Sequence, residues 1–226
     1  TIIAPWGEDA GYWGVGESLE ISEKLLAVAA PTYNEGGGVG NGGVFLFHQE
    51  ESEWVESIVT ASDGHQEDGF GSALSISGDT MAVGAGSLSG WPGAVYLYRW
   101  DGEVWEETIL KAQGLWNQGN RFGGSVSLDG NRLAVGATGR SHLDSGSVYL
   151  YDWDGTDWVE TILKPSDSVV GDSFGTSVTL VGDLLTVSSR TMVYQFVWNG
   201  ESWTEKKWLE GPPEDATSYL LTQALS

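Results

Sequence analysis

The chain has 226 residues, with 32 Asp and Glu against 10 Lys and Arg, and a formal net charge of −22. This balance excludes a nucleic-acid partner, because nucleic-acid backbones are bound through clustered Lys and Arg. The sequence has no cysteine, which excludes disulfides and thiolate metal sites, and no apolar run approaches the ~18 residues that predict insertion into a membrane.

Four related segments follow one another along the chain. Each begins with Phe-Gly or Val-Gly, alternates apolar with small polar residues, and turns back over a short sequence that contains Gly in three of the copies. This pattern predicts two short β-strands joined by a tight turn in every copy. The copies start at residues 15, 70, 122 and 174 and read VGESLEISEKLLAVAAP, FGSALSISGDTMAVGAG, FGGSVSLDGNRLAVGAT and FGTSVTLVGDLLTVSSR.

Two further strands follow each segment. In the third copy a loop leads to SVYLYDW (147–153), and a hairpin then leads to WVETILK (158–164). Asp-Gly or Asn-Gly in these hairpins predicts type I′ turns, which need positive φ angles. The Trp residues on either side are expected to face each other across the hairpin. These pairs are Trp100/Trp105, Trp153/Trp158 and Trp198/Trp203.

Four strands in a repeat of about 50 residues are typical of a β-propeller blade. We therefore predict an all-β fold, a β-propeller of four-stranded antiparallel blades, over residues 1–226 as a single region. Two arrangements stay open: an arc of a larger propeller, which the stacking of blades on neighbours favours, or a ring closed by an incomplete fifth blade. The full repeats lie at approximately 12–68, 69–120, 121–172 and 173–210, with 1–11 ending a preceding blade and 211–226 starting a following one.

The spacing of Phe-Gly and Gly-Ala resembles the FG-GAP repeat of the integrin α-subunit propeller. The resemblance covers about residues 12–210, and it implies part of a larger, seven-bladed propeller on a secreted or cell-surface protein. The first and fourth copies depart from the motif, since Ala29 and Ser188 stand where it has its second glycine. The matching pairs are Phe70-Gly71 with Gly84-Ala85, and Phe122-Gly123 with Gly136-Ala137.

Integrin-type blades often carry a calcium cage between their first two strands. Here those connections read SEK, SGD, DGN and VGD, and they are too short to surround a cation with six to eight oxygens. The family's calcium sites are therefore not carried over to this chain. We predict no cofactor and no metal ligand, and leave calcium open at other positions.

The loops of a propeller blade lie on two opposite faces. Loops between the second and third strands and between repeats share one face, here called the loop face (5–13, 31–43, 61–69, 86–93, 112–120 and 138–146). These loops vary in length and sequence, as binding loops on a rigid scaffold do. Their aromatic side chains either anchor a ligand or pack over the blades. The candidate ligand-binding residues are Trp6, Trp13, Tyr33, Asn34, Trp91, Trp116 and His142.

No catalytic motif survives inspection. GVGNGG (38–43) matches a dinucleotide-binding pattern, but it precedes a strand and not a helix. We therefore predict that the chain is not an enzyme. The favoured function is an extracellular or cell-surface interaction module that binds a protein partner through the loop face, for adhesion or assembly. Two alternatives stay open: a carbohydrate-binding propeller lectin, and a structural subunit of a large extracellular assembly, joined through sheet edges or chain ends. An open arc with exposed blade flanks would favour the structural subunit.

Overall fold

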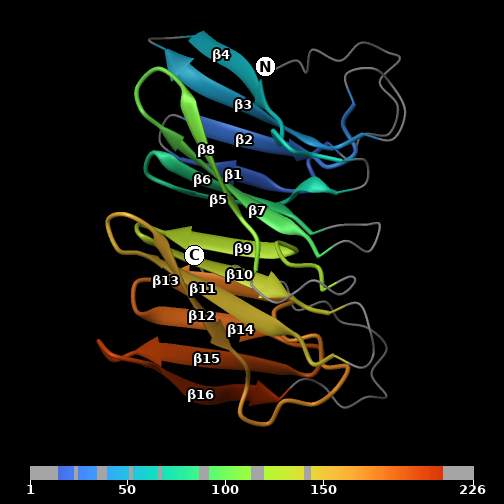
Figure 1. The fold of residues 1–226 in the computed structure, drawn as a ribbon, viewed down its shortest axis with the longest axis vertical. Coiled ribbons are helices and arrows are strands. Elements are labelled where there is room, and N and C mark those ends of the chain that lie inside the picture. Colours follow the sequence, from blue (N-terminus) through green and yellow to red (C-terminus); the bar gives the residue numbers. More distant parts are fainter. Residues whose placement is uncertain are drawn as a thin grey trace.

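The computed structural model describes residues 15–22, 25–34, 40–50, 53–65, 68–86, 92–112, 120–139 and 144–210. In these residues it contains sixteen strands and no helix, and the strands form four sheets of four antiparallel strands each. Each sheet is built from four consecutive strands, paired in chain order (Figure 1). The all-β prediction is therefore confirmed. The predicted ends of neighbouring blades, 1–11 and 211–226, lie outside the described residues.

The four sheets are the blades of the propeller. Blade 1 holds β1 (Leu19–Ile21), β2 (Leu25–Ala30), β3 (Gly43–Glu50) and β4 (Glu53–Val59). Blade 2 holds β5 (Phe70–Ser77), β6 (Thr80–Ala85), β7 (Ala94–Trp100) and β8 (Trp105–Leu110). Blade 3 holds β9 (Ser125–Asp129), β10 (Arg132–Ala137), β11 (Ser147–Trp153) and β12 (Trp158–Leu163). Blade 4 holds β13 (Ser177–Val181), β14 (Leu184–Ser188), β15 (Met192–Trp198) and β16 (Trp203–Glu210).

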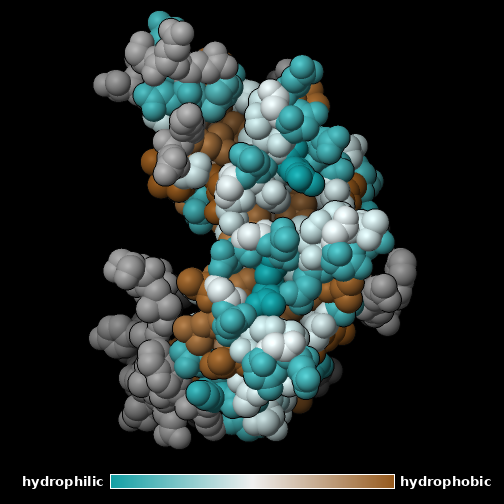
Figure 2. Space-filling view, turned by 90° about the vertical axis from the view of Figure 1, so that its left-hand side faces the viewer, coloured by the Kyte–Doolittle hydropathy of each residue, from teal (hydrophilic) through white to brown (hydrophobic). Residues whose placement is uncertain are grey.

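Successive blades lie side by side, and their first strands contact one another in the order β1, β5, β9 and β13. Blade 1 lies at one end of the stack and blade 4 at the other (Figure 1). Figure 2 shows the resulting arc, which is hollowed on one side. The described strands do not close into a ring, so the chain forms an open arc of a β-propeller.

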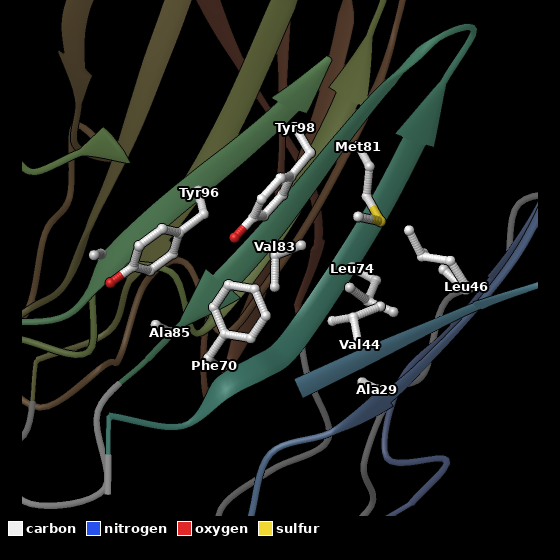
Figure 3. Close-up of a cluster of buried hydrophobic side chains, with 12 residues drawn as sticks. Ala29, Val44, Leu46, Phe70, Leu74, Met81, Val83, Ala85, Tyr96 and Tyr98 are labelled. Atoms are coloured by element: carbon white, nitrogen blue, oxygen red, sulfur yellow. The ribbon is translucent and has the colours of Figure 1, made fainter. Parts of the chain in front are cut away.

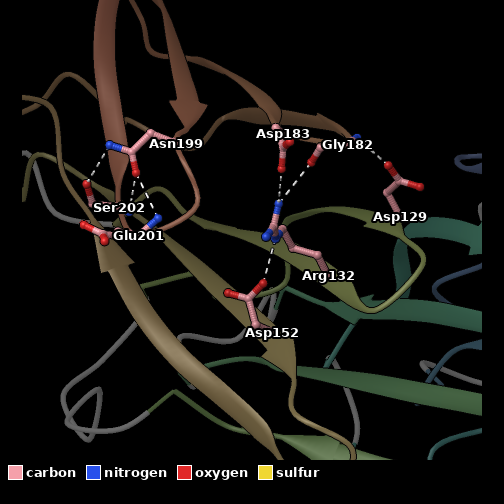
Figure 4. A network of polar contacts seen from close by, with 8 residues as sticks. All are labelled: Asp129, Arg132, Asp152, Gly182, Asp183, Asn199, Glu201 and Ser202. Carbon is pink, nitrogen blue, oxygen red and sulfur yellow. Dashed lines mark hydrogen bonds and ion pairs between the residues drawn. The ribbon is translucent and has the colours of Figure 1, made fainter.

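The hairpins between third and fourth strands correct one prediction. Gly102, Gly155 and Gly200 have positive φ angles, but the Asp or Asn before each of them does not. A type I′ turn needs both. Instead, the Oδ1 atom of Asp101 accepts the N–H groups of Glu103 and Val104, both at 2.8 Å. The same bonds recur at Asp154, and at Asn199, whose turn is shown in Figure 4.

The predicted Trp pairs face each other across these hairpins. Their ring centroids lie 5.3 to 5.6 Å apart with the planes tilted by 48 to 52°. Each pair is the last rung of the ladder between the third and fourth strands, as at Trp100 and Trp105. The hairpin 101–104 and its copies therefore have a structural role. Their Asp or Asn side chain stabilises the turn, and the flanking Trp pair ends the strand ladder.

The phenylalanine of each Phe-Gly pair belongs to the apolar core that its blade shares with the preceding blade. Phe70, Phe122 and Phe174 are fully buried. The Phe70 ring meets the edges of Tyr96 and Tyr98 with centroid distances of 5.1 and 6.1 Å (Figure 3). Such edge-to-face contacts contribute about 0.5–1.5 kcal/mol beyond the buried area. Phe122 and Phe174 meet two aromatic rings of their own third strands in the same way.

The main chain of the same phenylalanine joins its blade to the preceding one. Phe70, Phe122 and Phe174 form parallel bridges with Gly42, Gly93 and Gly146. A Cβ atom on these glycines would lie 2.1 to 2.2 Å from the phenylalanine carbonyl oxygen, which is far inside van der Waals contact. The glycine before the third strand of blades 1 to 3 is therefore required by the close approach of the next blade, and its positive φ angle favours glycine as well. We call this contact the inter-blade joint.

The glycine of the Gly-Ala pair, which is the second glycine of the motif, is required for the same reason. A Cβ atom on Gly84 would lie 2.0 Å from the carbonyl oxygen of Gly123, and one on Gly136 would lie 2.0 Å from that of Gly175. Neither Gly84 nor Gly136 has a positive φ angle. Space between blades, and not backbone conformation, thus explains why the motif needs glycine here.

We expect Gly136→Ala to lower the free energy of unfolding by about 3 kcal/mol, because its methyl group would collide with the backbone of blade 4. Gly130→Ala is the matched control. Gly130 lies in a turn with φ 55° and has no atom near its absent Cβ, so the backbone strain alone should cost about 1 kcal/mol. Guanidinium denaturation followed by Trp fluorescence measures both, and equal losses would contradict the close-approach explanation.

Candidate functional site

The two faces of the arc are built differently. On the turn face, the first two strands of blades 2, 3 and 4 are joined by the short turns 78–79, 130–131 and 182–183, and the hairpins 101–104, 154–157 and 199–202 share one geometry. The loop face carries connections of unequal length. Antiparallel strand order places these two sets of connections at opposite ends of the strands, as the sequence predicts.

Of the predicted ligand-binding residues, Tyr33 and Asn34 lie in the described part of the chain. The Tyr33 ring meets Phe45 edge-on at 5.2 Å and packs against the apolar cluster of blade 1. Its N–H group donates to Ala30 and its carbonyl accepts from Gly42. The ring therefore packs over its own blade, beside Asn34. The other candidates, Trp6, Trp13, Trp91, Trp116 and His142, lie outside the described residues.

A polar contact that the sequence analysis missed holds the loop after β4 onto blade 2. The Tyr96 hydroxyl donates to Asp63 Oδ1 at 2.7 Å, and the Lys111 ammonium donates to Asp63 Oδ2 at 2.7 Å. The neighbouring Ser62 donates its N–H and its hydroxyl to the carboxylate of Glu107. We call this Ser-Asp contact across two blades a latch.

The latch recurs between blades 3 and 4. Ser166 donates its N–H and its hydroxyl to Glu205 at 2.7 and 3.0 Å, and the Tyr194 hydroxyl donates to Asp167 at 2.9 Å. Ser62-Asp63 and Ser166-Asp167 occupy the same place after the fourth strand. A Ser-Asp pair that repeats at this place was the sequence signal that could have revealed the latch.

Burial and hydrogen bonding shift the pKa of three ionisable groups at the first latch. Burial, followed by the bonds to Asp63 and Glu107, raises the pKa of both Tyr96 and Tyr98, so their hydroxyls stay proton donors. The bond from Lys111, followed by that from Tyr96, lowers the pKa of Asp63. In blade 3, burial and the nearby Glu160 raise the pKa of Tyr149 to about 12. A charged Asp63 carboxylate and protonated tyrosine hydroxyls are suited to a structural role, because they keep the hydrogen bonds of the latch in place.

On the turn face, Arg132 fastens blade 3 to blade 4 (Figure 4). Its Nε donates to Asp152 at 2.6 Å, and its Nη1 lies 3.1 Å from the Gly182 carbonyl. The guanidinium also lies over the rings of Trp198 and Trp203, 5.1 to 5.3 Å from their centroids. Cation–π contacts contribute about 0.5–2 kcal/mol each, depending on exposure. Strand patterns predicted the Trp pair but not the cation above it.

Within the described ranges, no three His, Asp or Glu side chains converge as metal ligands. His65 and Asp68 lie together, and the Asp68 carboxylate accepts the His65 main-chain N–H at 2.7 Å. In the part of the chain that the structure describes, no helix is long and apolar enough to cross a bilayer.

The family comparison agrees with the motif and with the joints that it forms. A model of the FG-GAP repeat matches residues 54–98 and 116–151, which include the Phe-Gly pairs of blades 2 and 3. The chain is an FG-GAP repeat protein. No curated protein sequence matches the chain significantly.

Solved structures similar to this FG-GAP chain include a fungal lectin from Aleuria aurantia with a six-bladed β-propeller fold and fucose recognition. It is 15% identical with a TM-score of 0.46, over 82% of this chain and 57% of the lectin. A variant of that lectin in complex with Fucα1-6GlcNAc is 16% identical with a TM-score of 0.45, over 82% of this chain and 58% of the lectin. The same variant with α-methyl-L-fucoside is 15% identical with a TM-score of 0.44, over 82% of this chain and 57% of the lectin. The chain thus spans less than two thirds of these lectins.

We expect Asp63→Asn to weaken the FG-GAP latch in a pH-dependent way. The folded pKa of Asp63 is lowered, so its bonds stabilise the fold above the unfolded pKa of about 4 and are lost as the pH falls through the folded pKa. At pH 7 the variant should lose about 1 kcal/mol, a modest value because the side chain is 38% exposed.

Thermal or guanidinium unfolding between pH 2 and pH 7 measures this loss, and the difference from the wild type should shrink as the pH falls. Asp157→Asn is the control, because Asp157 lies in the exposed hairpin of blade 3 and no latch bond reaches it. A difference that stays constant down to pH 2 would contradict the assignment of the ion pair.

Proposed function

We propose that this FG-GAP protein is a non-catalytic interaction module that binds a protein partner through its loop face. The observation that carries the proposal is the contrast between the faces: uniform short turns on one, and unequal loops fastened to a rigid stack on the other. Binding residues are commonly placed on such loops over a rigid scaffold.

The described loop segments bond to one another. The Asn41 side chain donates to the Gly64 carbonyl at 3.2 Å, which joins the two loops of blade 1. The Gly171 N–H donates to Asp144 at 2.9 Å, and the Gly139 N–H donates to Asn120 at 3.1 Å. A surface whose loops are fixed in advance loses less conformational entropy when a partner binds. This preorganisation supports a protein-binding face.

We place the module at the cell surface or outside the cell, in adhesion or assembly. The support is the FG-GAP repeat, which resembles the integrin α-subunit propeller, together with the acidity of the chain. A net charge of −22 favours partners with a basic surface and speeds their encounter.

A second function, as a structural subunit of an assembly, is favoured by a specific observation. Val15, Leu19 and Ile21 at the open side of blade 1 are 42, 59 and 72% exposed. Exposed apolar side chains that gather on one flank are typical of an interaction surface.

The loop-face proposal predicts that Trp91→Ala with Trp116→Ala reduces partner binding at least tenfold, about 1.4 kcal/mol. Immobilised wild-type and variant proteins are compared for recovery of proteins from an extracellular extract by quantitative mass spectrometry. Trp54→Ala is the matched control, because Trp54 is 43% exposed and lies beside a hairpin of the opposite face. A partner that is lost with Trp54→Ala and kept by the double variant would assign binding to the turn face.

A glycan array separates this function from the lectin alternative. We expect no sugar to be bound by the wild type. Sugar binding that the double variant loses would replace the protein-binding proposal by the carbohydrate-binding one.

A further inference from the structure

Three groups of blade 2 bind the loop that carries the first latch. The Tyr96 hydroxyl and the Lys111 ammonium both donate to the Asp63 carboxylate. The Glu107 carboxylate accepts the N–H and the hydroxyl of Ser62. A tyrosine donor, an ammonium and a carboxylate thus recognise a serine followed by an aspartate. We call these three groups the latch-binding site of the blade.

Blade 3 has the same three groups in the same places. Glu160 accepts the hydroxyl of Tyr151 at 2.6 Å, as its counterpart in blade 2 accepts that of Tyr98 at 2.6 Å. Each lysine directly follows the fourth strand of its blade, and the tyrosines and glutamates share one ladder register. The corresponding groups of blades 2 and 3 are Tyr96 and Tyr149, Glu107 and Glu160, and Lys111 and Lys164.

The loop between blades 2 and 3 has a different sequence from the loops that form the latches. Ser-Asp stands third and fourth after β4 and after β12, at residues 62–63 and 166–167. The third and fourth residues after β8 are Gln113 and Gly114, and no residue from 112 to 120 has a carboxylate or hydroxyl side chain. This loop therefore has no carboxylate to offer to the latch-binding site of blade 3.

The donors of this site lack the bonds that their counterparts make. Tyr149 is 3% exposed, yet in the part of the chain that the structure describes its hydroxyl makes no hydrogen bond, whereas those of Tyr96 and Tyr194 each bond a latch aspartate. No buried side-chain polar atom of the described residues lacks a partner, so the Tyr149 hydroxyl reaches the surface. Lys164 is exposed and forms no ion pair with any described residue.

The charges around the unfilled site resemble those around the filled one. Burial, followed by Glu160 and Asp144, raises the pKa of Tyr149 to about 12, so its hydroxyl remains a donor at neutral pH. Lys164 supplies a positive charge at the place where Lys111 bonds Asp63. A carboxylate held between an ammonium and a hydroxyl donor forms charge-assisted hydrogen bonds, which are the stronger kind.

We propose that the latch-binding site of blade 3 binds a Ser-Asp segment of a partner protein. The aspartate carboxylate of the partner accepts from the Tyr149 hydroxyl and the Lys164 ammonium, and its serine donates to Glu160. The filled sites of blades 2 and 4 hold this occupant in the same chain. This inference rests on the proposed loop-face function, because the site lies on that face and supplies one chemistry by which it recognises a protein.

The probe is a blocked peptide of sequence ASDGH, that of residues 61–65. Its titration into ¹⁵N-labelled wild-type protein should shift the amide resonances of Tyr149, Glu160 and Lys164. We expect a dissociation constant of about 0.1–1 mM, because a few hydrogen bonds must offset the ordering of the peptide. The same peptide with asparagine in place of aspartate should bind at least tenfold more weakly, since it has lost the charge.

Two variants and a matched control locate the peptide. Tyr149→Phe removes the hydroxyl and keeps the ring that packs on Phe122, and Lys164→Gln removes the exposed ammonium. Each should weaken peptide binding at least fivefold and leave cooperative unfolding intact. Tyr96→Phe is the control, because it removes the corresponding hydroxyl from a filled site, and it should bind the peptide as the wild type does.

Two results with the peptide overturn the inference. One is the absence of any shift in folded wild-type protein at about 10 mM peptide. The other is peptide binding that Tyr149→Phe and Lys164→Gln leave unchanged.

Recovery of partners from an extracellular extract keeps this inference apart from the loop-face function. A partner that is lost with Trp91→Ala and Trp116→Ala but kept by Tyr149→Phe with Lys164→Gln would contradict this site and support the loop face. Peptide binding that depends on Tyr149, with an extract that yields no loop-face partner, would support the site and contradict the loop-face function.

Discussion

The structure depends on how closely the backbones of neighbouring blades approach at the Phe-Gly pair. At each joint a carbonyl oxygen occupies the place that a Cβ atom would take on the facing glycine. The residue before each phenylalanine, Gly69, Arg121 or Ser173, is left-handed, and this conformation costs non-glycine residues about 1 kcal/mol. The joint fixes the phenylalanine main chain, and the ring is then held beneath two aromatic side chains of its own blade. One dipeptide therefore couples the core of a blade to the placement of its neighbour.

The junctions are reinforced at both faces, but not equally. A Ser-Asp latch lies on the loop face of the junction between blades 1 and 2 and of the junction between blades 3 and 4. The junction between blades 3 and 4 also has the Arg132 contacts on the turn face. Buried apolar contact has no direction, so it holds blades together without fixing their angle closely. The latches and the Arg132 contacts are directional bonds. Together they hold the loop ends in position, which is the property that a preformed binding face requires.

Local patterns were sufficient to predict the blades. Alternating apolar residues and Gly-containing turns specify strands over a few residues, and the repeat gives their grouping. The hairpin type was wrong, because the Asp101 side chain folds the turn with negative φ where Asp-Gly alone suggested type I′. Asp63 and Arg132 were missed because each binds groups about 50 residues away, which becomes visible only when blades are placed side by side. Of the predicted binding residues, Tyr33 turned out to pack on Phe45.

The first junction shows which departure in blade 4 matters most. Blade 1 has Ala29 where blades 2 and 3 have the second glycine, and blade 2 still docks, with the Cβ position of Gly71 3.2 Å from the Ala29 methyl. One methyl group at that place is thus compatible with docking of the next blade. No junction accommodates a side chain before the third strand, where Gly42, Gly93 and Gly146 are all kept. Thr191 occupies that place in blade 4, and burying Gln195 without partners would cost about 1–3 kcal/mol more. Two or three side chains therefore set blade 4 apart from the preceding blades, while its own core stays that of an FG-GAP blade.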